Sequence, residues 1–300
     1  MESKKENMAA DLISIALCTY NGLAFLPEQM QSFLDQDYQN LEIVVVDDGS
    51  TDGTYELLKQ YLKENSNIRL YQNPETLGFN RNFEKALGLC NGEFIAFADQ
   101  DDIWDLNKIS KLRANVHDNL LIYHDSEFII NGKLSGKKIS DNHRFIKGKC
   151  EPYLLYDNCI SGHACLISKK LLPHILPFPK NMYYDWWIGY TAANIGKLDF
   201  INQPLVKHRR HAASSTASDK ITGKQKRIDN LRIFNEHKLN NKETNSLIKQ
   251  MLKGYEELNE KAFSFKLFKL LLVNADTLFY TRRKSLYKKI RFIIEESTSR

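Results

Sequence analysis

Polar and acidic side chains follow three short apolar runs in the first hundred residues of this 300-residue chain. Thr19, Tyr20 and Asn21 follow the first run, and the string Asp-Asp-Gly-Ser-Thr-Asp begins at Asp47 after the second. A third string, Asp-Gln-Asp-Asp, begins at Asp99. Carboxylates this close together repel one another unless a cation or hydrogen-bond donors are present. Mg²⁺ or Mn²⁺, completed by substrate phosphates, is the simplest compensation.

Each acidic string also has a structural explanation. The segment 50–52 fits a turn followed by a helix N-cap, and 99–102 fits a solvated acidic loop before a helix. Capping does not explain the adjacent acids Asp47 and Asp48. Ligands of open α/β sheets bind beyond the carboxyl ends of the strands, where all three strings are expected. Their repetition at strand ends therefore favours a metal and nucleotide site.

A regular alternation of strand and helix patterns must position these side chains. Strands are predicted at 12–18, 43–46, 68–71 and 94–98, and helices at about 25–34, 53–65 and 79–89. The uncharged, β-branched runs are typical of strands buried on both faces of a parallel sheet. The sequence therefore predicts an α/β fold with a doubly wound, mostly parallel sheet.

The pattern is less regular after residue 105. A helix to about 117 is expected there, then strands near 121–130, 164–168, 197–201 and 205–208, a loop or hairpin at 131–149 and a helix near 186–193. From 223 onward almost everything reads as helix. We expect one domain over 1–219, made of a nucleotide-binding half at about 12–105 and a second half at about 106–219. A basic helical extension over 220–300 follows.

Charge is unevenly distributed along the chain. The net charge is +5, but residues 220–300 carry 19 Lys and Arg against 9 Asp and Glu, which leaves 23 basic and 28 acidic residues in 1–219. This balance gives no indication of a nucleic-acid partner. Five scattered cysteines show no disulfide or zinc spacing, and neither a signal peptide nor a long apolar span is evident. A cytoplasmic protein, soluble or peripherally bound, is expected.

The basic extension has two interpretations. Apolar residues interleave with lysines over 261–271, and a similar mixture covers 282–290. This pattern favours amphipathic helices that contact an anionic membrane surface. The alternative is that the same apolar residues pack on the catalytic domain or on a second subunit.

The strand-end motifs together resemble a known family. Ala16 to Asn21, Val46 to Asp52 and Phe97 to Trp104 resemble the inverting family 2 glycosyltransferases of the GT-A fold. The string Asp-Gln-Asp-Asp-Ile-Trp, with the later Asp185-Trp186 pair and His211, is similar to the bacterial rhamnosyltransferase-type branch that builds surface polysaccharides. The resemblance covers about residues 12–215.

The resemblance implies roles for individual residues. It implies nucleotide contacts for Thr19, Tyr20, Asn21, Asp47, Asp48, Arg81 and Asp99, metal contacts for Asp101, Asp99 and His211, and an acceptor floor at Gly162 and His163. In this scheme Asp47 accepts the N3 hydrogen of a uracil-like base, and Asp102 is left as support. An exposed helix arginine and a satisfied, partly buried histidine are equally good explanations for Arg81 and His163. His211 ends the basic string that begins at Lys207 and suits a leaving diphosphate by its charge.

Inverting transfer also needs a base that deprotonates the acceptor hydroxyl. The candidate is Asp185, because the family places its catalytic Asp in an Asp-Trp setting. Trp186 and Trp187 follow it, and aromatic faces commonly border sugars, so both are predicted to contact the acceptor. A partly apolar wall also raises a carboxylate pKa. A plain N-cap is the competing explanation for Asp185.

The sequence thus predicts a metal-dependent inverting glycosyltransferase that uses a UDP- or dTDP-linked sugar. The expected acceptor is a hydroxyl of a growing cell-surface polysaccharide or of a polyprenyl-linked oligosaccharide. The leading donor is dTDP-rhamnose, from branch resemblance alone, and the alternative is a UDP-hexose or UDP-N-acetylhexosamine. A nucleotidyltransferase would carry a Gly-rich, basic loop after the first strand, which Cys18 to Gly22 is not. A membrane-associated scaffold leaves the acidic strand ends unexplained.

Overall fold

The computed structural model describes residues 10–210 and 223–299. Within them, nine strands form one mixed sheet in the order β3-β2-β1-β4-β8-β6-β9-β5, with β7 paired to β6. The strands are β1 (Ile13–Thr19), β2 (Leu41–Asp47), β3 (Ile68–Gln72), β4 (Phe94–Ala98), β5 (Ile103–Trp104), β6 (Leu121–Ile130), β7 (Lys133–Lys138), β8 (Cys165–Ser168) and β9 (Leu198–Arg210).

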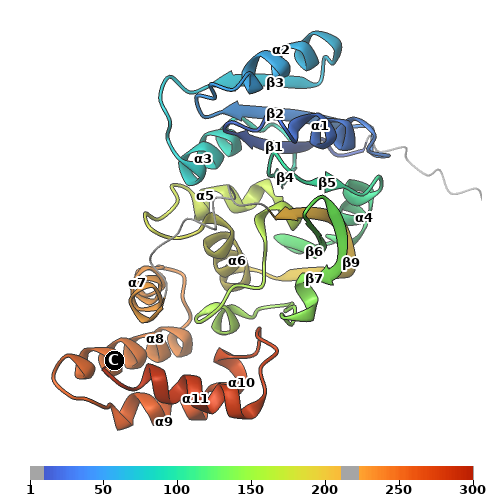
Figure 1. Ribbon diagram of the computed structural model, residues 1–300. Coiled ribbons are helices and arrows are strands. Elements are labelled where there is room, and N and C mark those ends of the chain that lie inside the picture. The colour runs from blue at the N-terminus through green and yellow to red at the C-terminus, as the bar shows by residue number, and fades with distance from the viewer. Residues whose placement is uncertain (1–9, 211–222, 300) are drawn as a thin grey trace, which may run out of the picture.

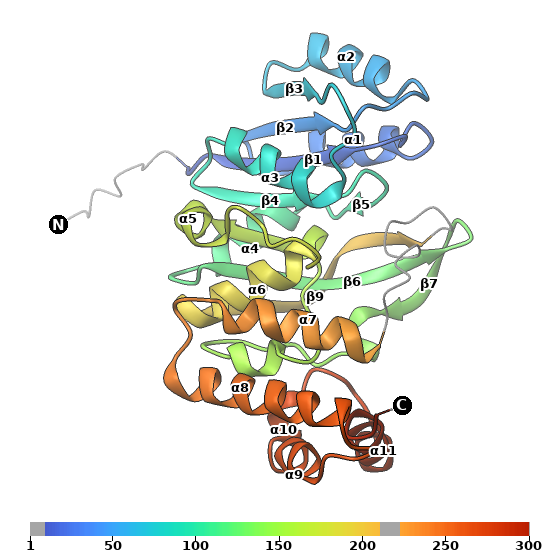
Figure 2. The ribbon, with the colours of Figure 1, turned by 90° about the vertical axis from the view of Figure 1, so that its left-hand side faces the viewer.

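Helices cover both faces of this sheet (Figures 1 and 2). The α-helices are α1 (Leu26–Leu34), α2 (Thr54–Glu64), α3 (Phe79–Leu89), α4 (Lys108–Asn115), α5 (Leu172–Ile175), α6 (Tyr184–Ile195), α7 (Lys224–Asn235), α8 (Lys242–Glu256), α9 (Phe265–Val273), α10 (Ala275–Leu278) and α11 (Leu286–Glu296). Short 3₁₀ helices are η1 (Ile139–Asp141), η2 (Glu151–Leu154), η3 (Gly162–Ala164), η4 (Lys169–Leu171) and η6 (Glu257–Asn259).

The first half is the parallel α/β unit that the sequence predicts. β1 pairs in parallel with β2 and β4, and β2 pairs in parallel with β3. Side chains of β1 and β2 are buried on both faces, because α1, α2 and α4 cover one side and α3 covers the other. The register places Thr19 beside Asp47, and Asp47 beside Gln72. The polar strand ends therefore lie at one edge.

The second half adds the antiparallel strands. β8 runs antiparallel to β4 and β6, whereas β6 and β9 are parallel. β9 is one long strand where the sequence predicts two, because its pairing with β6 shifts register between Ile201 and Pro204 and then continues. Proline lacks an N–H, and a local irregularity accommodates it in the ladder. The expected hairpin after β6 is formed by β7.

The C-terminal helices α7 to α11 pack against the second half, at the end opposite β3 (Figure 2). The Phe234 ring stacks on Tyr190 of α6 with a centroid distance of 4.0 Å, and Asn241 donates to Glu151 Oε1 at 2.5 Å. The buried apolar residues of α7 to α11 belong to the same core cluster as those of α6. Among the described residues, no helix is both long and apolar enough to cross a bilayer.

Candidate active site

Three loops at the carboxyl edge of the parallel strands form one wall of a cavity of about 640 Å³. Thr19 ends β1 and Tyr20 follows it, Asp48 follows β2, and the segment 99–101 follows β4. The facing wall comes from η3, the start of α6 and the end of β9. The fold therefore gathers most of the strand-end side chains that the sequence singles out.

Asp47 does not line this cavity. It is fully buried, and its Oδ1 accepts from Thr19 Oγ1 at 2.9 Å and from Ser50 Oγ at 2.5 Å. Its Oδ2 accepts from Ser50 N at 3.0 Å and from Gln72 Nε2 at 3.2 Å. Four donors fill the acceptor sites of a carboxylate. Asp47 thus joins the ends of β1, β2 and β3, and a base could reach it only by displacing one of these donors.

Asn21 also lies outside the cavity lining and joins two loops. Its backbone has a positive φ of 49°, which asparagine tolerates better than most residues. Its N–H donates to Ser50 Oγ at 2.9 Å, and its Oδ1 accepts from Thr51 N at 2.9 Å. Asp47 and Asn21, two of the expected nucleotide contacts, therefore lie outside the cavity lining and serve loop geometry.

Asp48 is the carboxylate of the adjacent pair that faces the cavity. Its Oδ1 accepts from Asn73 Nδ2 at 2.7 Å and from Leu77 N at 2.8 Å, and its Oδ2 accepts from Gly78 N at 2.8 Å. Gly78 has a φ of 82°, in a region that favours glycine. Asp48 therefore fixes the loop that leads into α3 along the cavity rim.

Gln100 clips the β4 loop to the β1 loop. Its Oε1 accepts from Tyr20 N at 2.8 Å, and its Nε2 donates to Tyr20 O at 2.9 Å. Gly22 permits this approach, since a Cβ there would lie 2.2 Å from Gln100 Oε1. The clip positions the carboxylates on either side of Gln100.

Asp99 and Asp101 both line the cavity. Desolvation and then the negative charges of Asp102 and Asp101 raise the pKa of Asp99 to about 8. A bound cation would reverse this shift, because it stabilises the ionised carboxylate. The electrostatics of the loop therefore favour a positive ligand beside Asp99.

Behind this loop lies a buried cluster of Asp102, His163 and His208. Asp102 Oδ1 lies 2.9 Å from His208 Nδ1, and Asp102 Oδ2 lies 3.9 Å from His163 Nδ1. The two imidazoles stack with centroids 4.3 Å apart. The three residues come from the β4 loop, η3 and β9, so the cluster joins both walls of the cavity.

The cluster holds an ion pair. Burial opposes ionisation of Asp102, but the charges of His208 and His163 outweigh it and lower the pKa of Asp102 to about 2. Desolvation acts against the charge of His208, yet the attraction of Asp102 raises the pKa of His208 to about 8. Desolvation and the nearby His208 lower the pKa of His163 to about 3. A neutral His163 thus stacks on a charged His208.

These residues fit a divalent cation. Ligand atoms of Asp102, His163 and His208 lie within 4.8 Å of one another, and carboxylate and imidazole ligands suit Mn²⁺. Asp102 Oδ2 is buried and has no hydrogen-bond donor among the residues that the structure describes, and Asp99 Oδ2 lies 3.8 Å from His163 Nδ1. Of the expected metal ligands, Asp99 and Asp101 adjoin this cluster, whereas His211 lies outside the described residues.

Sequence reasoning missed Lys108, which is fully buried beneath the cluster. Its Nζ donates to His163 O at 2.6 Å and lies 3.2 Å from the ring centroid of Trp104. Burial holds the pKa of Lys108 well below its usual value. Lys108 therefore fixes the backbone of η3 behind the cavity. No motif marks it, because in the sequence it is one of several lysines at the start of a helix.

Asp185 lines the wall formed by α6. It lies in the first turn of the helix, whose N-cap is Tyr183, so N-capping does not explain it. Burial raises the pKa of Asp185 to about 6, although the backbone N–H groups of Trp186 and Gly162 bond to the carboxylate and oppose the shift. Such a carboxylate is mostly ionised at neutral pH and is still basic enough to accept a proton.

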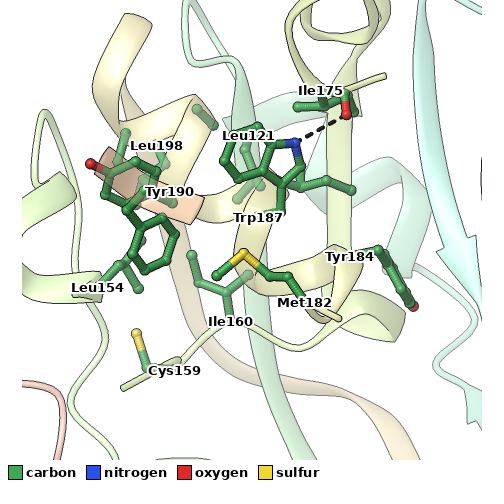
Figure 3. Close-up of a cluster of buried hydrophobic side chains, with 14 of the residues drawn as sticks. Leu121, Leu154, Cys159, Ile160, Ile175, Met182, Tyr184, Trp187, Tyr190 and Leu198 are labelled. Atoms are coloured by element: carbon green, nitrogen blue, oxygen red, sulfur yellow. Dashed lines mark hydrogen bonds between the residues drawn. The ribbon is translucent and has the colours of Figure 1, made fainter. Parts of the chain in front are cut away.

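Trp186 and Trp187 do not line the cavity, which corrects the expectation that they contact an acceptor. Trp187 is buried in the core, where its Nε1 donates to Ile175 O at 3.0 Å (Figure 3). Trp186 Nε1 donates to Leu154 O at 2.6 Å. Consecutive helical residues project in different directions, so an inward Asp185 turns both indoles toward the core.

Other residues supply the aromatic wall. Phe79 and Tyr183 line the cavity and stack with centroids 6.0 Å apart. Tyr184 also lines it, close to Gly162, where a Cβ would lie 2.0 Å from Tyr184 Oη. Gly162 and His163 also line the cavity, and their contact with an acceptor stays a prediction.

Within 10–210 and 223–299, the cations that line the cavity are His208 and Arg210 of β9. Arg209 turns away, since its Nη2 donates to Glu28 Oε2 at 2.5 Å and its Nε to Asp101 O at 2.9 Å. Arg81 is absent from the lining and pairs with Glu84 on the surface of α3 at 2.8 Å. The structure thus does not bring Arg81 to the site.

Comparison with known proteins agrees with this geometry. The model of the family "Glycosyl transferase family 2" matches residues 14–175, which is more than half of the chain and includes all three strand-end motifs. The chain belongs to glycosyl transferase family 2. An uncharacterised glycosyltransferase of Haemophilus influenzae is 29% identical over 218 residues, covering 69% of this chain and 68% of the relative.

A second relative of this family 2 enzyme has an assigned activity. It is the Escherichia coli UDP-Glc:alpha-D-GlcNAc-diphosphoundecaprenol beta-1,3-glucosyltransferase WfgD, which is 28% identical over 231 residues, covering 76% of this chain and 88% of the relative. Among solved structures, Staphylococcus aureus TarS residues 1–349 with UDP-GlcNAc has a TM-score of 0.63 at 18% identity, covering 94% of this chain and 79% of that one.

A third comparison comes from an archaeal enzyme. The mannosyltransferase PcManGT of Pyrobaculum calidifontis, in complex with GDP-Man and Mn²⁺, has a TM-score of 0.54 at 16% identity, covering 96% of this chain and 74% of that one. At these identities the likeness shows the fold. The GT-A fold and family predicted from the motifs are therefore confirmed, and the rhamnosyltransferase-type branch stays a prediction.

Proposed function

We propose that this family 2 enzyme transfers a sugar from a nucleoside diphosphate donor with inversion at the anomeric carbon. The observation that carries the proposal is Asp185, a carboxylate with its pKa raised to about 6, in the same cavity as Asp99 and Asp101. One wall supplies a base, and the other supplies acidic residues suited to a cation and diphosphate. A single cavity thus holds both requirements of the reaction.

Asp185 takes the proton of the acceptor hydroxyl while the oxygen of that hydroxyl attacks the anomeric carbon. The bond from that carbon to the diphosphate oxygen breaks, and its electron pair leaves with the nucleotide. His208 and Arg210 face the cavity and oppose the negative charge that develops on the diphosphate. A bound Mn²⁺ or Mg²⁺ would add Lewis-acid stabilisation of the same charge. Asp101 and Asp99, with the adjoining Asp102 carboxylate, would hold that ion.

The donor we propose is a UDP- or dTDP-linked sugar. A carboxylate at the β2 strand end can accept the imide hydrogen of uracil or thymine, and cytosine offers no such donor. Asp48 faces the cavity, while Asp47 remains candidate only if a base displaces one of its four donors. The UDP-glucose named for WfgD and the UDP-GlcNAc bound to TarS favour a UDP-hexose over dTDP-rhamnose.

The acceptor we propose is a hydroxyl of a saccharide carried on a polyprenyl diphosphate. The diphosphoundecaprenol acceptor named for WfgD supports this class. The C-terminal helices add a second support, because Phe265, Val273, Leu286 and Tyr287 are exposed beside many lysines and arginines. We propose that this surface contacts the anionic inner face of the cell membrane, where such an acceptor lies.

Ligand-dependent thermal stability tests the donor site without an acceptor. The purified chain is heated with UDP, dTDP, GDP or CDP, each with Mn²⁺, Mg²⁺ or chelator. A ligand at 100 times its Kd stabilises the folded state by about 2.7 kcal/mol. We expect UDP or dTDP to raise Tm only with metal. Absence of stabilisation by any nucleotide at saturating concentration would contradict the proposal.

Asp101→Ala tests the metal assignment in the same assay. We expect the metal-dependent part of the UDP stabilisation to disappear, because Asp101 is the proposed direct ligand. Asp105→Ala is the matched control, since Asp105 is an exposed acid four residues on and does not line the cavity. Unchanged Mn²⁺-dependent stabilisation in Asp101→Ala would show that Asp101 is not the ligand.

A further inference from the structure

A second, smaller cavity of about 180 Å³ lies between the α/β body and the C-terminal helices. Its apolar lining consists of Tyr156, which precedes η3, and of Phe279 and Phe292 from the C-terminal helices, together with Leu278. The rings of Tyr156 and Phe279 meet edge to face at 5.1 Å, and those of Phe279 and Phe292 at 5.5 Å. Both parts of the chain thus contribute to this apolar floor.

Four cations line the same cavity, and two of them are neutralised. Arg227 forms a two-pronged pair with Glu296, in which Nε donates to Oε2 at 3.0 Å. Arg282 Nη2 lies 2.7 Å from Asp157 Oδ1. These pairs fix the two arginines at the junction of body and extension.

Lys284 and Lys289 carry the excess charge. The Lys289 side chain is only 13% exposed, and its carboxylate partner, Asp276, lies 3.8 Å away on a fully exposed side chain. Lys284 Nζ lies 4.6 Å above the Phe292 ring, and no ion pair among the described residues includes it. Burial and the nearby Arg282 lower the pKa of Lys284. Drawing cations into a cavity is costly without a counter-charge, and an anionic ligand would supply it.

We propose that this cavity binds the phosphate of an anionic phospholipid from the membrane surface. Lys284 and Lys289 donate charge-assisted hydrogen bonds to the phosphate oxygens. Phe279 and Phe292 contact the glycerol and the first methylenes of the lipid. Lys284 has no ion-pair partner among the described residues, and Lys289 has only the fully exposed Asp276 at 3.8 Å, so the cavity carries an excess of positive charge. The single negative charge of a phosphodiester would offset this excess, which favours anionic over neutral lipids.

The surface next to the cavity indicates a lipid as the source of the phosphate. Leu286 and Tyr287 follow Lys284 closely in the chain and are 73% and 75% exposed. The residues before α9 lie beside those after α11, because Phe263 pairs with Thr298 in an isolated bridge. Phe265 and Val273, at the two ends of α9, add exposed apolar surface on these C-terminal helices. A soluble phosphate would not need such a surface. Only the assignment of a lipid as the source of the phosphate rests on the proposed membrane contact.

Isothermal titration with dihexanoyl phosphatidylglycerol, below its micelle concentration, tests the site on the full chain. Loss of two charge-assisted hydrogen bonds should weaken binding at least tenfold in Lys284→Gln/Lys289→Gln. The control, Lys269→Gln/Lys288→Gln, removes the same charge from exposed positions of α9 and α11. We expect its Kd to stay within about twofold of the parent, since exposed charges are screened. Equal weakening in both variants would overturn the cavity as the site.

Two further arms identify the source of the phosphate. Dihexanoyl phosphatidylcholine should not bind, and inorganic phosphate should bind at least tenfold more weakly than the anionic lipid. Inorganic phosphate binding as tightly as the lipid would overturn the lipid assignment. UDP-dependent stabilisation with Mn²⁺, measured on the same variants, should match the parent and shows that they fold.

Vesicle sedimentation separates this inference from the proposed membrane contact. If anionic vesicles retain the parent and both double variants equally, the membrane contact stands and the cavity fails. If the parent binds the short-chain anionic lipid but no vesicles, the phosphate site stands and the membrane contact fails.

Discussion

The nucleotide-binding half and the C-terminal extension are held together in different ways. At the strand ends, short polar side chains bond to neighbouring backbone, as Asp47, Asp48 and Gln100 do. In the extension, rings and long charged side chains reach across to the body, as Phe234 and Arg282 do. Bonds of this kind hold Asp47 outside the cavity, whereas Asp99, Asp101 and Asp185 line it and are the carboxylates to which we assign functions. The packed C-terminal helices leave apolar side chains and cations exposed, and these fit the proposed contact with a membrane surface.

The largest effect is expected at Asp185, the cavity carboxylate that does not belong to the strand-end loops. Asp185→Asn keeps the shape but cannot accept a proton, so transfer should fall by about 10² to 10⁴. Donor binding, measured as UDP stabilisation with Mn²⁺, should not change. The control is Asp118→Asn, an exposed acid after α4 that pairs with Lys197 and does not line the cavity. Transfer within a few-fold of the parent would place the base elsewhere.

The packing of the extension is tested by two phenylalanines that differ in burial. Phe234 is fully buried on Tyr190, whereas Phe265 is 70% exposed. Phe234→Ala should lower the free energy of unfolding by about 3 to 5 kcal/mol. Phe265→Ala should change it by less than about 0.5 kcal/mol. Urea unfolding measures both. Equal small losses would mean that α7 is not part of the cooperative core.

These two regions also differ in how well the sequence predicts them. The strands β1, β2 and β4 were predictable because they are almost wholly buried and polar residues stand at their carboxyl ends, and the register then brings Thr19 and Asp48 to one edge. The sequence pattern of α9 and α11 shows amphipathic helices but not what covers each face. Local pattern also fails at Trp186 and Trp187, because the direction of α6 decides which side chains face the cavity. Lys108 and the His208 pair with Asp102 depend on contacts between distant segments.

A pH profile tests the electrostatics of the cavity. Burial raises the pKa of Asp185 to about 6, and a base acts only when deprotonated. Activity should therefore fall as pH decreases from 7 through this pKa, by about tenfold per pH unit below 6. An ordinary exposed aspartate would keep its activity to about pH 4 to 5. The transfer rate at saturating substrates gives the profile. A rate that is constant from pH 7 to 5 would contradict the assignment, and Asp185→Asn should lose the dependence.

The smallest effect is expected at Gln100, which joins two strand-end loops. Gln100→Ala removes the bonds to Tyr20 N and Tyr20 O at an exposed position, a loss of about 1 to 2 kcal/mol in loop order. Because both loops line the donor cavity, this loss should appear as a several-fold higher Kd for UDP. The control is Gln31→Ala, which removes one exposed bond to Asp35 within α1 and should leave the Kd unchanged. Titration of UDP with Mn²⁺ measures both. A change in Tm without a change in Kd would mean that Gln100 stabilises the loops but does not position the donor. The difference between the hydrogen-bonded strand-end loops and the packed C-terminal helices would then concern stability alone.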